Sequence, residues 1–172
     1  ADAPGAGCST RNGAQISAGI KPSRAALARR FGAARAAAIR AEGRAAIDWV
    51  EGFVAREGID CGFRRAGRFL AAHTPGAYDA LVALSDTLRA EEGVDTRPVP
   101  RAEQGAEIGS DAYHGGLVHP HYATLHPGRY HRGLLERTRS AGVRLAAPCR
   151  ATAIRPEAPG FRVETTAGPV RA

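Results

Sequence analysis

The chain has 172 residues, enough for one domain with a core of its own, and 44% of them are hydrophobic. Its net charge of +7 comes from 23 arginines and one lysine, which are scattered among Asp and Glu instead of forming a basic block, so we expect no nucleic-acid partner. The three cysteines lie far apart and no apolar run approaches the ~20 residues of a membrane span. These features argue against a disulfide scaffold and a membrane protein, and we expect a cytoplasmic one.

A run of small residues near the start of the chain, residues 5–15, is its most informative motif. Three glycines within nine positions let the backbone turn and come close to a ligand. Ser9 and Thr10 offer hydroxyl groups, and the guanidinium of Arg11 matches the geometry of a phosphate. The pattern predicts a loop around an anionic cofactor. A solvated Gly/Ser loop is the alternative interpretation, because such loops are weak motifs by themselves.

Helices and short strands are expected to alternate along the rest of the chain. Apolar residues recur every three or four positions over 33–57, which predicts a long helix, with Trp49 packing beside its apolar stripe. Capping residues and prolines predict further helices over 24–31, 75–92 and 127–141. Short strands are expected at 61–64, 68–73, 94–99, 143–149, 151–154, 161–165 and 169–171. This order predicts an α/β or mixed α+β fold with a sheet of mixed direction.

Five of the six histidines fall within 18 residues, and their role has three interpretations. Imidazole binds zinc, copper or iron, but no Asp, Glu or Cys accompanies them at a known ligand spacing, so no metal site is assigned. They can be ordinary hydrogen-bonded or solvated side chains. One of them can also serve acid–base steps in a substrate pocket, since histidine titrates near neutral pH. The five are His114, His119, His121, His126 and His131.

The order of residues in the N-terminal loop closely resembles the GASGRNGGQ signature of the D-amino-acid oxidase-like (DAO) superfamily of FAD-dependent oxidoreductases, in particular its gamma-glutamylputrescine oxidase-like members. The matching residues are Ser9, Arg11, Asn12, Gly13 and Gln15. Three positions depart from the signature: Cys8 stands for an alanine, and Thr10 and Ala14 each stand for a glycine. If either former glycine position needs a positive φ, the loop is strained or shifted there.

The resemblance implies part of a Rossmann-type FAD-binding domain with an inserted substrate-domain segment. Residues 1–60 would hold the FAD-binding loop and the helices that follow it. Residues 61–113 would belong to the substrate domain, and residues 114–172 would return to the FAD-binding domain through a GGxxxP and LxP motif that begins at Gly115. The family's GxGxxG fingerprint and the second half of its flavin site are not in the sequence, so we expect an internal piece that is inactive alone.

The resemblance also implies which residues contact the cofactor, FAD. Ser9, Thr10 and Arg11 would meet the diphosphate and the ribityl chain, with Gly7 in the same loop. Asn12, Gly13 and Gln15 would border the isoalloxazine, and the backbone of Ala151 would meet the adenine.

The implied reaction is oxidation of a C–N bond in a small amine or amino acid, by hydride transfer to flavin N5 and hydrolysis of the resulting imine. No catalytic residue is assigned. The alternative from another class is a non-enzymatic basic domain that binds RNA or a protein partner through its arginines.

Overall fold

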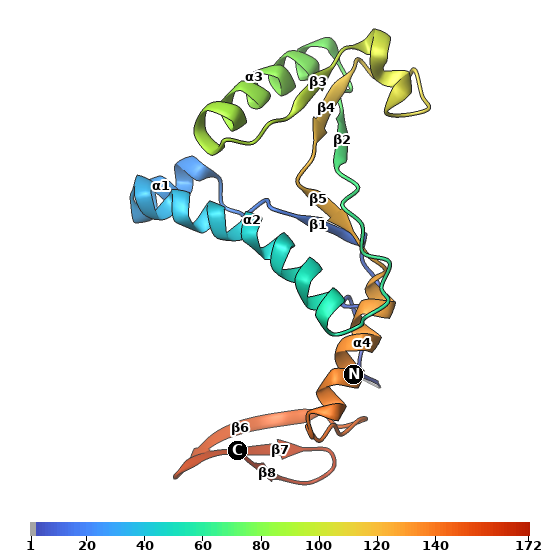
Figure 1. Cartoon of the computed structure of the whole chain (residues 1–172). Helices are drawn as coiled ribbons and strands as arrows, with labels where there is room; N and C mark the ends of the chain where they lie inside the picture. The colour runs from blue at the N-terminus through green and yellow to red at the C-terminus, as the bar shows by residue number, and fades with distance from the viewer. Residues whose placement is uncertain (1–2) are drawn as a thin grey trace. The chain divides into compact units, whose positions relative to one another are not determined.

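The computed structural model describes residues 3–172, which fold into two compact units (Figure 1). Unit 1 comprises the residues up to Ala14, Arg56–Cys61 and His126–Ala172, and unit 2 comprises Gln15–Ala55 and Gly62–Leu125. The chain therefore passes from unit 1 to unit 2 and back more than once. The units reflect contacts within the chain, and the assignment of segments to an FAD-binding part and a substrate part stays a prediction.

Unit 2 contains three helices that begin and end where the sequence predicts. Helix α1 (Arg24–Phe31) is capped by Ser23, whose Oγ accepts a hydrogen bond from Ala26 N at 3.4 Å. Helix α3 (Pro75–Glu92) ends at Gly93, which adopts the left-handed conformation with φ 62°. Helix α2 (Ala33–Arg56) buries Ile47 and Val54 but leaves Ala46 exposed. Trp49 stacks on Phe53 with ring centroids 5.0 Å apart, yet its own side chain stays largely exposed.

Two small antiparallel sheets complete unit 2. Strands β2 (Arg68–Ala71), β4 (Gly116–His119) and β3 (Arg97–Val99) pair in that order, and β1 (Gln15–Ser17) pairs with β5 (Tyr122–Thr124). The middle strand requires glycine at its start, because a Cβ at Gly116 would run into the carbonyl oxygen of Leu70 and the ring of Phe69. The glycine pair that opens the predicted GGxxxP motif thus has a packing role in this sheet.

The buried polar side chains of unit 2 all have hydrogen-bond partners. Ser85 on α3 and Thr96 share a hydroxyl hydrogen bond of 2.8 Å. Gln104, in the 3-10 helix η1 (Arg101–Ala106), accepts a hydrogen bond from Gly115 N at 2.8 Å and donates one to Ser110 O at 3.1 Å. These three hydrogen bonds fix the segments that flank β3 and β4.

Unit 1 contains helix α4 (Pro127–Ser140) and an antiparallel sheet of β6 (Ala151–Glu157), β7 (Gly160–Thr165) and β8 (Val170–Arg171). His126 caps α4, since its Nδ1 accepts a hydrogen bond from Arg129 N at 3.3 Å. Gly133 on α4 is buried against Ile59, and a Cβ there would lie 2.5 Å from Ile59 Cγ2. Gly133, Ile59 and Cys61 are all buried and form the core of unit 1.

The α/β class is confirmed, but several details differ from the expectation. Every strand pair within residues 3–172 is antiparallel, so the sheet of mixed direction is not found there. The strand predicted at 143–149 is wrong, because these residues are almost all exposed and irregular. The strand predicted at 61–64 is reduced to a single bridge between Arg64 and Thr124. Among the described helices, none has the length and apolar character that crossing a bilayer requires.

Candidate functional site

The N-terminal loop is held in shape by hydrogen bonds between its own residues. Thr10 Oγ1 donates to Gly5 O at 2.6 Å, and Asn12 Nδ2 donates to Cys8 O at 3.0 Å. Ala14 N in turn donates to Asn12 Oδ1 at 2.9 Å. Asn12 therefore ties two turns of the loop together, and Thr10, at a position where the family signature has glycine, closes the first of them.

Two of the loop's glycines face open space. A Cβ built at Gly7 or at Gly13 would meet no atom of the chain within 4 Å, and neither residue has a positive φ. Nothing in the chain itself therefore demands glycine at these positions. The room that they leave suits a ligand that comes close to the backbone, which is what the resemblance implies for FAD.

Charge is available beside this open backbone. Arg11 is exposed, and no carboxylate among residues 3–172 forms an ion pair with it. Ser9 is exposed as well. A free guanidinium and a free hydroxyl fit a diphosphate, so the donors on this loop suit FAD.

The predicted cofactor residues do not all lie in one element. Gly7, Ser9, Thr10, Arg11, Asn12 and Gly13 share the loop of unit 1. Gln15 opens β1 in unit 2, opposite Thr124. Ala151 is the exposed first residue of β6 in unit 1, opposite Thr165. Contacts of these residues with FAD stay a prediction.

The sequence listed His131 among the five clustered histidines but did not predict its contact with the loop. His131 on α4 lies beside Gly5, where a Cβ would come 2.7 Å from His131 Cε1 and 3.1 Å from Thr10 Cγ2. Gly5 also has a φ of 83°, so both its space and its backbone demand glycine. No sequence signal marks this contact, because its two partners are far apart along the chain.

Two of the other histidines contact each other. His119 and His121 lie with ring centroids 6.0 Å apart, and His119 Nδ1 accepts a hydrogen bond from His121 N at 3.3 Å. Burial lowers the pKa of His119, and the charge of His121 adds to that effect. Within residues 3–172 no group of three His, Cys, Asp or Glu side chains could hold a metal ion.

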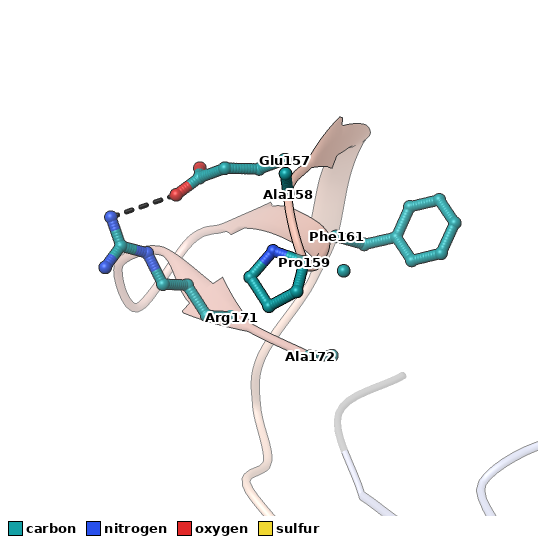
Figure 2. Close-up of a pocket in the computed structure, with 7 residues that line it drawn as sticks. Glu157, Ala158, Pro159, Phe161, Arg171 and Ala172 are labelled. Carbon is teal, nitrogen blue, oxygen red and sulfur yellow. Dashed lines mark ion pairs between the residues drawn. The ribbon is translucent and has the colours of Figure 1, made fainter.

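A cavity of about 500 Å³ at the β6–β7 turn contains none of the predicted site residues. Its wall includes Pro159 in the turn and an ion pair of 2.9 Å between Arg171 and Glu157. Figure 2 shows these two charged side chains pointing toward each other, while the ring of Phe161 points away from them. The two charged groups of this cavity are paired with each other, so it gives no indication of catalytic chemistry.

Several solved structures share this fold. Glycine oxidase from Geobacillus kaustophilus superposes with a TM-score of 0.77 at 22% identity, over 98% of this chain and 44% of its own. L-amino acid deaminase from Proteus myxofaciens, in complex with anthranilate, gives 0.69 at 18% identity, over 95% and 35%. L-alpha-glycerophosphate oxidase from Mycoplasma pneumoniae, with FAD bound, gives 0.69 at 13% identity, over 92% and 39%.

The family is shown by the sequence itself. Residues 1–172 match the DAO family, described as FAD dependent oxidoreductase, and the chain belongs to that family. The chain spans less than half the length of the solved structures named above. No curated protein matches it. The resemblance read from the loop is thereby confirmed at the level of the family.

Proposed function

We propose that the protein is an oxidoreductase that uses FAD to oxidise a C–N bond in a small amine or amino acid. Family membership supports the cofactor, and the observation that carries the proposal is the loop with open backbone at Gly7 and Gly13 beside the unpaired Arg11. The same arrangement would be unexplained in a loop that served only to connect elements. The family match does not favour a non-enzymatic basic domain.

The loop residues have different roles in this proposal. Arg11 and Ser9, both exposed, bind the diphosphate and the neighbouring ribityl chain. Thr10 donates its single proton to Gly5 O, so its oxygen can only accept a hydrogen bond, from a ribityl hydroxyl. Asn12 acts mainly through the shape of the loop, because both ends of its amide are engaged by the backbone. Gly13 and Gln15 border the isoalloxazine, and the backbone of Ala151 meets the adenine.

The C–N bond is proposed from the names of the similar structures. Two of the three are enzymes of amino acids, a glycine oxidase and an L-amino acid deaminase. The loop residues would hold FAD, which would supply the acceptor for the hydride that leaves the substrate carbon. Water then converts the imine to a carbonyl compound and releases the amine. Residues 61–113 are proposed to belong to the substrate domain and residues 114–172 to return to the FAD-binding domain.

The test is made with the protein purified as its complete reading frame encodes it. The visible spectrum is recorded after incubation with FAD and gel filtration, and a panel of amines and amino acids is then added without oxygen. We expect a flavin spectrum that bleaches with at least one of these substrates. A flavin spectrum that bleaches only with alcohols or glycerol phosphate would overturn the C–N proposal, and a colourless protein would overturn the cofactor.

A further inference from the structure

A cavity of about 180 Å³ in unit 2 has one charged end and otherwise apolar walls. Its charged end is formed by Arg40 and Arg44 from α2 and Glu92 from the last turn of α3. Its apolar walls are formed by Leu70, Leu84, Leu88, Val94, Leu117 and Tyr122. The cavity shares no residue with the loop at 5–15, so binding of a ligand in it can be tested separately from binding of FAD by that loop.

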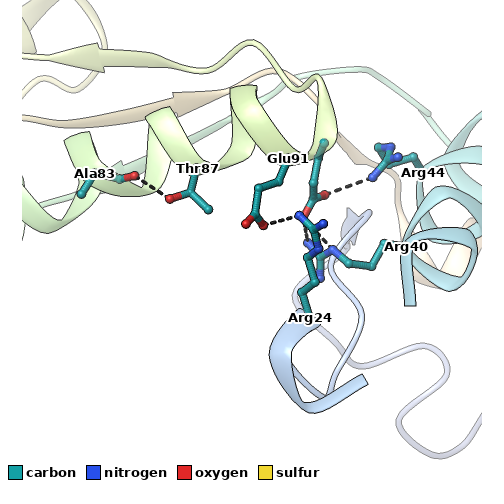
Figure 3. Close-up of polar contacts among 7 residues, drawn as sticks. Arg24, Arg40, Arg44, Ala83, Thr87 and Glu91 are labelled. Carbon is teal, nitrogen blue, oxygen red and sulfur yellow. Dashed lines mark hydrogen bonds and ion pairs between the residues drawn. The ribbon is translucent and has the colours of Figure 1, made fainter. Parts of the chain in front are cut away.

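The charged end has more positive than negative charge. Glu92 Oε1 accepts a hydrogen bond from Arg40 Nε at 2.6 Å, and Glu92 Oε2 accepts one from Arg44 Nη1 at 3.0 Å. Figure 3 shows both arginines reaching the end of α3. Their side chains are only 18% and 30% exposed, and that of Glu92 is 11% exposed. Two half-buried guanidinium groups share one carboxylate, which leaves a net charge of +1 on the cavity wall.

Of the two arginines, Arg44 is the one whose positive charge is less fully paired with Glu92. Arg40 binds Glu92 through two nitrogens, Nε and Nη2, whereas Arg44 uses Nη1 alone. No acceptor among residues 3–172 takes a hydrogen bond from Arg44 Nε or Nη2. An arginine with limited access to water and spare donors attracts an anion, because a charge withdrawn from solvent is costly unless paired.

The neighbouring histidine does not supply a further cation at neutral pH. His119 also lines the cavity, and burial lowers the pKa of its imidazole, with smaller lowering effects from His121 and Arg68 and an opposing one from Glu92. Its Nδ1 already accepts a hydrogen bond from His121 N, so the neutral ring has one donor left, at Nε2. The cavity therefore matches a single negative charge.

Holding α2 against α3 does not require Arg44. Arg40 already ties Glu92 through a hydrogen bond from Nε and an ion pair through Nη2, and the adjacent Glu91 is paired separately with Arg24 of α1. We propose that the cavity binds a small monocarboxylate with a short apolar body. Its carboxylate lies on Arg44, and its hydrocarbon part lies against the leucines of α3 and Leu117.

The volume limits the size of this ligand. An engineered cavity of about 150 Å³ accepts benzene, so about 180 Å³ suits roughly six to eight non-hydrogen atoms. 4-Methylpentanoate has the required charge, shape and size. Its neutral amide, 4-methylpentanamide, has the same shape without the charge and is the matched control.

Binding of both compounds is measured at pH 7 by isothermal titration calorimetry and by ligand-observed NMR. We expect a dissociation constant on the order of 1 mM or tighter for the acid, and at least tenfold weaker binding of the amide. Arg44→Gln should weaken binding of the acid at least tenfold and retain the circular dichroism spectrum. Arg24→Gln should leave the affinity unchanged, because Arg24 pairs with Glu91, which is not on the cavity wall.

A second variant, Leu84→Phe, tests the proposal even if Arg44→Gln does not fold. Leu84 is 40% exposed at the rim, so Leu84→Phe is tolerated by the fold while it fills the cavity, and it should abolish binding of the acid. No saturable binding of 4-methylpentanoate by the wild type would overturn the proposal. So would equal affinity for acid and amide, or an unchanged affinity in a folded Arg44→Gln or Leu84→Phe.

Discussion

The ring of His131 lies directly against Gly5, so that a Cβ at position 5 would come within 2.7 Å of His131 Cε1. This contact joins helix α4 to the loop that carries the predicted cofactor residues. Thr10 closes the same corner through its hydrogen bond to Gly5 O. The shape of the loop therefore depends on a residue outside it, and this gives the first prediction.

Gly5→Ala should destabilise the protein and weaken FAD binding together. The left-handed φ of 83° costs alanine about 1–2 kcal/mol, and the contact with His131 adds to this cost. Thermal unfolding and a flavin titration measure the two effects. Gly7→Ala is the matched control and should change the free energy of unfolding by less than about 0.5 kcal/mol, because its surroundings are open. Equal destabilisation by the two variants would contradict the contact.

Ala14→Gly should stabilise the protein. Ala14 has a φ of 62° and is the non-glycine residue that adopts a positive φ within the described part of the chain. Glycine removes a steric cost of about 1–2 kcal/mol but loses more entropy on folding, so the expected net gain is about 0.5–1 kcal/mol. Urea unfolding measures this gain in the free energy of unfolding, and the dependence of that free energy on urea concentration should be the same in both proteins. A loss of stability in Ala14→Gly would show that the loop is not strained there.

Glu92→Gln should be far more harmful than the same change one residue earlier. Glu92 is nearly buried between Arg40 and Arg44, and its loss leaves two half-buried cations without their counterion. Breaking buried pairs costs about 3–5 kcal/mol, and partial exposure reduces this to about 2–3 kcal/mol here. Glu91→Gln removes an exposed pair with Arg24 and should cost less than about 1 kcal/mol. Chemical denaturation of both variants compares them directly, and similar costs would contradict the role given to Glu92.

Stability should fall as the pH drops below about 6.5. The pKa of His119 is lowered in the folded protein by burial and by His121, so the unfolded chain binds a proton before the folded one does. The loss begins near the unfolded pKa and levels off below the folded pKa. In His119→Gln this part of the pH dependence should be absent. A melting temperature that falls equally in wild type and variant between pH 7 and pH 5 would contradict the assignment.

Local signals predicted the helices well, because a helix end is decided by nearby residues. Ser23 and Gly93 mark ends that the structure reproduces within a residue. Strands depend on a partner elsewhere in the chain, so 143–149 looked suitable but has none. The antiparallel pairing of β2 with β4 likewise joins segments that no local pattern relates.

The candidate site divides in the same way. Ser9, Arg11, Asn12 and Gly13 could be proposed from the sequence because they match a family signature, and the family is confirmed, while their contacts with FAD stay a prediction. The contact of His131 with Gly5 and the cavity at Arg44 could not, since each is made by residues that only the fold brings together. Packing against distant segments also explains the need for glycine at position 116.

The central claim is that the loop at residues 5–15 binds FAD, and a titration of flavin fluorescence against the protein encoded by the complete reading frame tests it most directly. The wild type should bind FAD saturably. Gly13→Val and Arg11→Gln should each weaken binding at least tenfold while the melting temperature without FAD stays unchanged, because position 13 has open space for a side chain and Arg11 pairs with no carboxylate among residues 3–172. Failure of the wild type to bind FAD, or unchanged affinity in both variants, would contradict the account.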